Sequence, residues 1–484
     1  MDEAQERTSD NNPARDSHLF GKGPKRVLAL DGGGVRGAIT VAFLERIEKL
    51  LEEEIKRSKA AASSLGPGAG KLRDQETEPE TRLCDWFDLV GGTSTGAIIA
   101  GALALGHSTA EIKDFYLRLA PRVFTHPFWR LPGLQAKFDA RALREEIDGI
   151  VKDRTLDSPD LKTGLCVVTK RLDTGSPWIL ANNPRAPYWN SEPADPGQGK
   201  TGHWGNRHYR LANLVRASTA APHLFDAEVV AVIEDGRKQP LANANASLAG
   251  YPWLSLLVSK FRAIQLLLTH GGSDGKTAPA QAGNYKARGL ENTHGLFVDG
   301  GVTPYNNPCM ALLMMTQLKG FGIEWPLGPE KLSIFSIGTG TYRSKLSFKE
   351  LGWFGPLKLT LRSLLSLMGD TETLTLAQMQ WLGECPQPWE INTEIGDMAE
   401  EAGFGQKWFR FLRYDVRLET AWMKKNLNLD VSERELERLR RMDDPGIIKH
   451  IYDIAGIAAE QQVKREHLLQ TSAARNPSGV ALTA

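Results

Sequence analysis

The sequence Gly92-Thr93-Ser94-Thr95-Gly96 most constrains what this chain can fold into. An apolar stretch, residues 86–91, precedes it and another, residues 97–105, follows it. This succession predicts a buried strand, a tight turn and a buried helix. Two glycines leave room for a serine on a sharp turn, and the turn would direct its Oγ toward the first N–H groups of the helix. The pattern predicts that Ser94 is a nucleophile, although a G-x-S-x-G match by itself also occurs by chance.

A second strand–turn–helix unit lies earlier in the chain. Residues 26–30 are apolar, Asp31-Gly32-Gly33-Gly34-Val35-Arg36-Gly37 follows, and residues 38–55 carry apolar side chains at helical spacing. Consecutive glycines are costly unless the backbone must direct several N–H groups at one point. A nucleotide loop is the competing interpretation, because residues 32–37 match G-x-G-x-x-G. It is disfavoured, since no P-loop lysine follows and the region about 20 residues downstream predicts helix and loop rather than a strand ending on an acid.

A third apolar stretch, residues 295–298, ends on Asp299-Gly300-Gly301. Because the carboxyl ends of parallel strands share one edge of a sheet, the three turns can meet there. Asp299 would then act as the base for Ser94, and the backbone N–H groups of Gly32, Gly33 and Gly34 would form an oxyanion hole. The alternative for Asp299 is a turn residue whose carboxylate caps a backbone N–H.

These three motifs, in this order, resemble those of the patatin-like phospholipase family. The resemblance runs from about Arg26 to Gly340, with an insertion at residues 235–292 outside it. It implies a three-layer α/β/α sandwich with a mainly parallel central sheet. It also implies a Ser–Asp dyad without histidine, an acyl-enzyme intermediate, and calcium-independent hydrolysis of acyl esters in phospholipids or related lipids.

The resemblance assigns a role to individual residues. Ser94 corresponds to the nucleophile, Asp299 to the base and Gly32 to Gly34 to the oxyanion hole, with Gly92 and Gly96 as the glycines of the elbow. No metal and no other cofactor is implied. Arg36 takes the place of an arginine beside the glycine loop and would order that loop, the alternative being a plain surface arginine. Asp31 is expected to be a structural residue at the end of its strand, and residues 217–222 also resemble a family segment.

Four regions are expected along the chain. Residues 1–25 are polar, lack the apolar core of a signal peptide and predict a disordered tail. The hydrolase domain would span 26–370, a mostly helical extension 371–470, and a second disordered tail 471–484.

Two helices are candidates for membrane contact. Residues 251–269, inside the insertion, and residues 353–368 each predict an apolar helical face with basic residues nearby. Either helix can instead pack on the core or form a lid, so interfacial binding is one of several interpretations.

Composition narrows the class of partner. With 59 Lys and Arg against 58 Asp and Glu, the net charge is +1, which argues against nucleic acid as a main partner. The four cysteines show no motif spacing and predict reduced thiols. No run reaches the ~18 apolar residues of a membrane span. We therefore expect a cytoplasmic protein that is peripheral at the membrane surface, with a phospholipid or other lipid ester as substrate.

The leading hypothesis is a lipid acyl hydrolase of the phospholipase A or lysophospholipase type. A neutral-glyceride lipase or a general esterase is the first alternative. A Ser-His-Asp hydrolase would need a late histidine such as His450 or His467, both of which lie in charged segments that predict helices. A catalytically silent scaffold or nucleotide-binding module is the last alternative, and the presence of both Ser94 and Asp299 argues against it.

Overall fold

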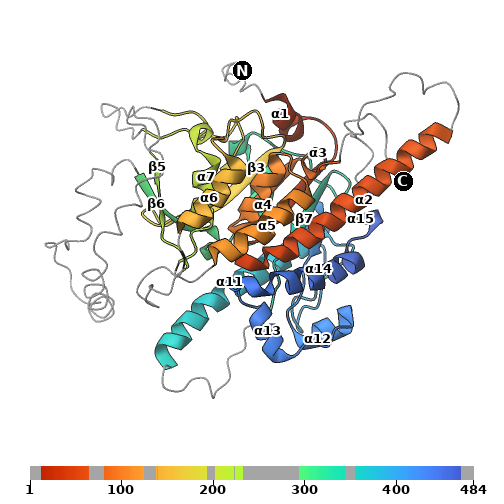
Figure 1. The fold of residues 1–484 in the computed structure, drawn as a ribbon. Coiled ribbons are helices and arrows are strands. Elements are labelled where there is room, and N and C mark those ends of the chain that lie inside the picture. Colours follow the sequence, from red (N-terminus) through yellow and green to blue (C-terminus); the bar gives the residue numbers. More distant parts are fainter. Residues whose placement is uncertain are drawn as a thin grey trace.

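The computed structural model describes residues 12–64, 81–124, 138, 140–192, 202–222, 224–232, 294–343 and 355–469. These residues form a three-layer α/β/α sandwich around a mostly parallel sheet, which confirms the predicted fold class (Figure 1). Among them, no helix is both long enough and apolar enough to cross a bilayer.

The strands form a single nine-stranded sheet in the order β5-β6-β3-β2-β1-β7-β9-β8, with β4 paired to β3 off this path. They are β1 (Lys25–Leu30), β2 (Leu89–Thr93), β3 (Gly164–Arg171), β4 (Ser176–Ala181), β5 (Glu228–Ala231), β6 (His294–Asp299), β7 (Leu332–Ile337), β8 (Gly383–Glu384) and β9 (Phe409–Tyr414). The pairs from β3 through β2, β1, β7 and β9 to β8 are parallel. By contrast, β4 and β6 run antiparallel to β3, and β5 runs antiparallel to β6.

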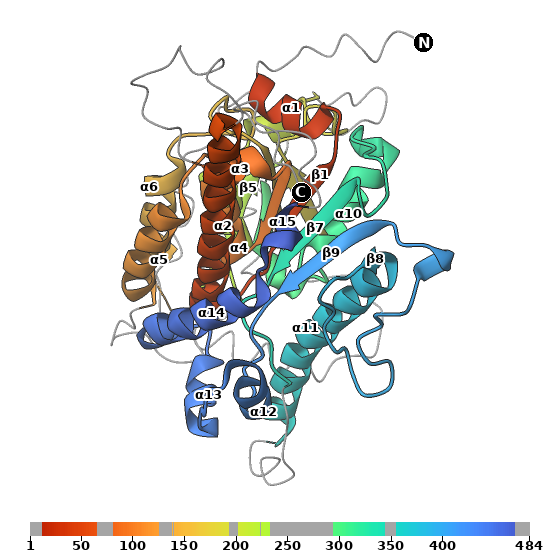
Figure 2. The ribbon, with the colours of Figure 1, turned by 90° about the vertical axis from the view of Figure 1, so that its right-hand side faces the viewer.

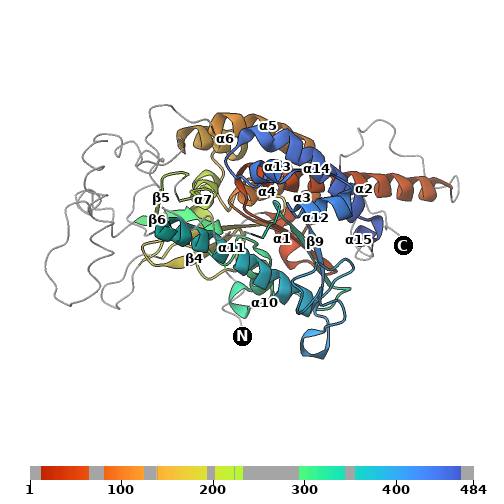
Figure 3. The same ribbon diagram turned by 90° about the horizontal axis from the view of Figure 1, so that it is seen from below.

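Helices cover both faces of the sheet (Figures 2 and 3). The first face carries α2 (Gly37–Ser64), α4 (Thr95–Ala104), α5 (Thr109–Val123), α6 (Ala140–Val151), α7 (Leu211–Ser218) and α14 (Ile448–Gln462). The second face carries α1 (Pro13–Phe20), α10 (Cys309–Gln317) and α11 (Gly355–Leu382). The shorter helices are α3 (Leu83–Trp86), α12 (Thr420–Trp422), α13 (Glu433–Leu439) and α15 (Arg465–Leu469).

The central strand β1 shows how the sequence builds two cores. Successive side chains of a strand point to opposite faces. Leu28 and Leu30 accordingly join the hydrophobic core under α2 and α4, whereas Val27 and Ala29 join the core under α10. All four are fully buried. A continuous apolar run is typical of a parallel strand covered on both faces, so the sequence reads as unbroken rather than alternating.

The predicted disordered tail is wrong for Pro13–Phe20, which forms α1. Asn12 caps the helix by accepting the N–H of Arg15, and proline occupies its first turn, where no N–H is needed. Leu19 is buried in the second core, and its carbonyl accepts Trp325 Nε1–H at 2.7 Å. Residues 1–11 lie outside the described residues.

The structure also differs from the predicted boundary at residue 370. Helix α11 runs through it without a break, and β9 lies inside the main sheet between β7 and β8. Helix α14 packs against α2 on the first face (Figure 2). The strand predicted near residues 408–416 is confirmed, but it belongs to the same sheet as the hydrolase motifs. The insertion at 235–292 with its helix at 251–269, and the tail at 471–484, lie outside the described residues.

Candidate active site

Ser94 lies on a strained turn between β2 and α4. Its backbone has φ 54° and ψ −122°, a conformation that side-chain-bearing residues rarely adopt. A Cβ at Gly92 would collide with the Gly96 carbonyl, and a Cβ at Gly96 would collide with the Leu30 carbonyl. The two glycines are therefore required by close backbone approach. The predicted elbow is present, and Ser94 is only half-buried at the N-terminus of α4.

Asp299 lies next to Ser94, although 205 residues separate them in the chain. Ser94 Oγ donates a hydrogen bond to Asp299 Oδ2 at 2.6 Å, and Asp299 Oδ1 accepts the N–H of Gly301 at 2.7 Å. The cap and the contact with the serine, considered as alternatives from the sequence, are thus both made by one carboxylate. The cap holds the carboxylate in the orientation that presents its other oxygen to Ser94.

The strand that carries Asp299 reaches this edge by a different route from the one predicted. β6 is antiparallel to β3, so the argument from parallel strand ends holds for β1 and β2 and is wrong for β6. β6 pairs only with the last part of β3, and Asp299 lies opposite Thr169. Thr93, next to Ser94, lies opposite Val168 on the other side of β3. The partial overlap of the two strands places Asp299 at the correct edge.

Burial raises the pKa of Asp299 to about 6. The hydrogen bonds from Ser94 and Gly301 and the charge of Arg216 act in the opposite direction and limit the rise. Arg216 is itself fully buried, and desolvation lowers its pKa. A carboxylate with this pKa is mostly ionised at neutral pH and remains a better proton acceptor than an exposed aspartate, which suits a general base.

The glycine loop after β1 lies beside the elbow. In the described part of the chain, the N–H groups of Gly33 and Gly34 have no hydrogen-bond partner. The Gly32 N–H instead donates to the carbonyl of Asn306 at 3.2 Å. The prediction that all three glycines offer free N–H groups is therefore wrong for Gly32. A loop that binds back to the chain at its first residue leaves two donors free.

Several contacts fix this loop against its neighbours. Thr339 Oγ1 donates to the Gly32 carbonyl at 2.8 Å, and Thr95 Oγ1 donates to the Gly34 carbonyl at 2.9 Å. The Gly34 carbonyl also accepts the Tyr116 hydroxyl. Because Thr95 is adjacent to Ser94, these bonds couple the position of the loop to that of the nucleophile.

Arg36 is buried rather than on the surface, with 7% of its area exposed. Its Nη1 donates to the Gly340 carbonyl at 2.8 Å, and its guanidinium lies over the Tyr342 ring. The alternative of a plain surface arginine is wrong. Asp31, at the end of β1, is also buried and forms an ion pair with Arg413.

Ser218 is a neighbour of the site that sequence reasoning missed. Its Oγ accepts the backbone N–H of Ser94 at 2.8 Å and donates to the Val168 carbonyl at 2.6 Å. The residue lies at the end of α7, within the stretch Arg216–Pro222 whose small side chains predict close packing. That composition was the available signal, but it did not indicate a hydrogen bond to the elbow.

Neither late histidine takes part in this site. His467 is buried and pairs with the Tyr414 hydroxyl at 2.9 Å, and burial lowers its pKa to about 4. His450 pairs with Glu435 at 3.4 Å on the surface. The geometry therefore excludes these histidines as partners of Ser94. Within the residues that the structure describes, no group of three or more His, Cys, Asp or Glu side chains is arranged to hold a metal ion.

Comparison with known proteins gives concordant matches. A family model described as patatin-like phospholipase matches residues 28–313. The chain is 31% identical over 224 residues to a cGAMP-activated phospholipase of Vibrio cholerae, covering 44% of this chain and 52% of that protein. It is 29% identical over 205 residues to a cUMP-AMP-activated phospholipase of Escherichia coli, covering 42% and 50%.

A plant protein matches as well. Patatin-17 of Solanum cardiophyllum is 26% identical over 172 residues, covering 33% of this chain and 37% of that protein. The chain thus spans about half the length, or less, of the curated relatives that it matches.

Proposed function

The chain belongs to the patatin-like phospholipase family, and on that premise we propose that it hydrolyses acyl ester bonds of membrane phospholipids through Ser94 and Asp299. The observation that carries this proposal is the 2.6 Å hydrogen bond from Ser94 Oγ to Asp299 Oδ2 on a strained elbow. A nucleophile hydrogen-bonded to a base of raised pKa is the minimum arrangement for acyl transfer.

In the first half of the reaction, ionised Asp299 accepts the Oγ proton as Ser94 attacks the ester carbonyl carbon. Negative charge moves to the carbonyl oxygen, where the Gly33 and Gly34 N–H groups and the N-terminus of α4 stabilise it. Collapse of this intermediate breaks the ester C–O bond, and the departing alcohol takes the proton from Asp299. The product is an acyl ester on Ser94.

In the second half, Asp299 accepts a proton from water as the water oxygen attacks the acyl carbon. The tetrahedral intermediate uses the same N–H donors. Its collapse returns the proton to Ser94 Oγ and releases a fatty acid. Each donor in such a hole contributes ~3 kcal/mol of transition-state stabilisation, so two free glycine N–H groups account for a substantial part of the catalysis.

Two competing functions use the same residues differently. A neutral-glyceride lipase or general esterase would share the dyad, and the pattern of lipid products distinguishes them. The nucleotide-binding interpretation of residues 32–37 is disfavoured by packing, because a Cβ at Gly33 would overlap the Thr339 side chain and one at Gly34 would meet the Met442 carbonyl. These glycines face protein neighbours closely on the sides where their missing side chains would lie.

Helix α11 supports a contact with lipid. Leu367 and Leu374 are 57% and 58% exposed, and their seven-residue spacing places them on one helical face. Between them, Met368 Cε lies 3.6 Å from the position that a Gly301 Cβ would occupy. An exposed apolar face beside the candidate site fits a helix that rests on a lipid surface.

The experiment compares wild-type protein with Ser94→Ala, Asp299→Ala and the control Ser176→Ala, which removes an exposed hydroxyl on β4. Mixed phospholipid and triglyceride vesicles are incubated with each protein, and products are identified by mass spectrometry. Since two relatives are named as activated by cGAMP or cUMP-AMP, each assay is run with and without these compounds. Labelling by a fluorophosphonate reports on Ser94 independently of the lipid.

We expect fatty acid and lysophospholipid from the wild type and the control, and neither from Ser94→Ala or Asp299→Ala. Ser94→Ala should also remain unlabelled. Full lipid hydrolysis by folded Ser94→Ala would reject the proposal, and release of fatty acid from triglycerides alone would favour the lipase alternative.

A further inference from the structure

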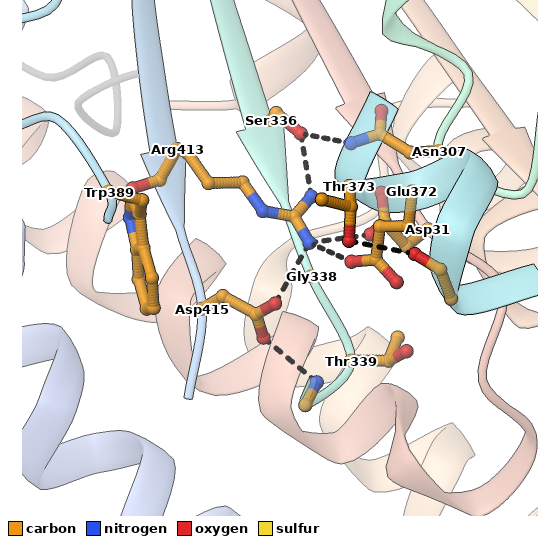
Figure 4. Close-up of polar contacts among 12 residues, drawn as sticks. Asp31, Asn307, Ser336, Gly338, Thr339, Glu372, Thr373, Trp389, Arg413 and Asp415 are labelled. Atoms are coloured by element: carbon orange, nitrogen blue, oxygen red, sulfur yellow. Dashed lines mark hydrogen bonds and ion pairs between the residues drawn. The ribbon is translucent and has the colours of Figure 1, made fainter. Parts of the chain in front are cut away.

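Behind the glycine loop, one buried guanidinium lies among three carboxylates (Figure 4). Arg413 Nη2 lies 2.8 Å from Asp31 Oδ2, 2.7 Å from Glu372 Oε1 and 2.8 Å from Asp415 Oδ2. We refer to these four residues as the Arg413 cluster. The side chains of Asp31, Arg413 and Asp415 are no more than 3% exposed, and that of Glu372 is 20% exposed.

The cluster joins three parts of the fold. Asp31 follows β1 and directly precedes the glycine loop, Arg413 and Asp415 lie at the end of β9, and Glu372 lies on α11. β7 separates β1 from β9 in the sheet. Arg413 also donates from Nη1 to Ser336 Oγ on β7, at 2.8 Å. A single side chain therefore links three strands and a helix of the second face.

Asp415 extends the cluster to the far side of the loop. Its Oδ1 accepts the Gly340 N–H at 2.8 Å, and the Gly340 carbonyl accepts Arg36 Nη1, also at 2.8 Å. Arg36 belongs to the same motif as the glycines. The loop is therefore connected to Arg413 at both ends, through Asp31 before Gly32 and through Gly340 and Arg36 after Gly34.

The charges make Arg413 necessary for this arrangement. The Asp31 carboxylate has no hydrogen bond that meets full geometric criteria, so the ion pair with Arg413 is its compensation. Burial raises the pKa of Asp31 and that of Glu372, which shows how costly their ionised forms are here. Although burial opposes its charge, the neighbouring acids hold the pKa of Arg413 above its usual value. Without that cation, excess negative charge would remain beside the site where an oxyanion forms.

We propose that Arg413 is a positioning residue for ester hydrolysis, which fixes the glycine loop through Asp31 and Asp415 and, through Glu372, makes the loop depend on the docked position of α11. This inference rests on the proposed function of Ser94 and Asp299. Arg413 does not touch the reacting atoms. It acts by holding the Gly33 and Gly34 N–H groups where the oxyanion develops, and a small misplacement of such groups is expensive in rate.

The test uses full-length protein and a soluble short-chain nitrophenyl ester, so that lipid binding does not enter. Glu372→Ala removes the connection to α11, whereas Glu372→Gln keeps an oxygen acceptor for Arg413. Thr373→Ala, on an exposed neighbour in the same helix, is the matched control. Arg413→Lys keeps the charge but cannot reach Ser336 and the three acids together. For each variant kcat, KM, the pH profile, the fluorophosphonate labelling rate and the melting temperature are measured.

We expect kcat to fall between about tenfold and a hundredfold in Glu372→Ala and Arg413→Lys, with KM within about twofold of the wild type. The midpoint of the pH profile, set by Asp299, should stay unchanged. Glu372→Gln should restore most of the loss, and Thr373→Ala should match the wild type.

Wild-type kcat in folded Glu372→Ala overturns the proposal, including when the melting temperature falls, because that result assigns the residue to stability alone. If Arg413→Lys does not fold, the Glu372 variants decide. A wild-type protein that neither hydrolyses the ester nor reacts with the fluorophosphonate, under any of the activator conditions above, instead rejects the proposed function.

Discussion

The backbone N–H of Ser94 donates to Ser218 Oγ at 2.8 Å, and the same hydroxyl donates to the Val168 carbonyl at 2.6 Å. The strained elbow is thereby attached to the end of α7 and, through it, to β3. A turn with φ 54° is held in place by its surroundings rather than by its own preference. Ser218 is one of the contacts that supply this restraint.

Ser218→Ala should therefore lower kcat by about tenfold and the free energy of unfolding by ~1–3 kcal/mol, since it leaves a buried N–H and a buried carbonyl without their partner. Ester kinetics and urea unfolding measure the two effects. Ser176→Ala, an exposed serine on β4, is the control and should change neither. A Ser218→Ala protein with full kcat would show that the elbow does not need this contact.

The pH dependence of hydrolysis should report on Asp299. The residue accepts a proton only as the carboxylate, and burial raises its pKa to about 6. We expect kcat/KM for a soluble ester to increase as the pH rises, to reach half its maximum near pH 6, and to fall about tenfold per unit well below that. A midpoint near pH 4, the value of an exposed aspartate, would contradict this assignment.

Asp299→Asn should abolish hydrolysis without destabilising the protein. The pKa of Asp299 in the folded state, about 6, exceeds the ~3.9 of an unfolded chain. The folded state thus binds this proton more tightly, and the stability that it contributes is full below pH 4 and is lost as the pH rises through 6.

The non-ionising asparagine avoids that loss, so we expect Asp299→Asn to be more stable than the wild type at pH 8, by up to ~3 kcal/mol. Urea unfolding at pH 8 and pH 5 measures the difference, which should shrink at pH 5. A larger advantage at pH 5 than at pH 8 would have the wrong sign.

Gly33→Ala should displace the glycine loop. The backbone at this position has φ −178°, which any residue adopts, so the effect arises from space rather than from strain. The new Cβ would overlap the Thr339 side chain. We expect activity to fall at least about a hundredfold, as for loss of an oxyanion donor. Gly320→Ala, whose Cβ would meet nothing within 4 Å, is the control, and similar activity in both variants would argue against the loop.

Leu367→Asp and Leu374→Asp should weaken binding to phospholipid vesicles in a flotation assay, because each places a charge on the exposed apolar face of α11. Hydrolysis of a soluble ester should stay within about twofold of the wild type. Leu172→Asp tests the same substitution at another exposed leucine, between β3 and β4. Unchanged flotation of both α11 variants would reject this face as the lipid contact.

The sequence alone determined the local units of this protein. The elbow around Ser94, the glycine loop at residues 32–34 and the apolar strands that precede them follow from steric and hydrophobic rules that act between near neighbours. The α/β/α class follows from the order of such units. The candidate nucleophile, its base and the loop were for this reason identifiable by residue number before any contact was known.

Tertiary structure decided what joins these units. β6 runs antiparallel to β3 and still places Asp299 beside Ser94, because the two strands overlap only in part. The Gly32 N–H binds Asn306, which leaves two glycine donors free. Arg413 lies far along the chain from Asp31 and compensates its charge. Strand direction, hydrogen-bond partners and buried ion pairs depend on contacts between distant segments, and a pattern that reflects near neighbours does not encode which distant partner will be met.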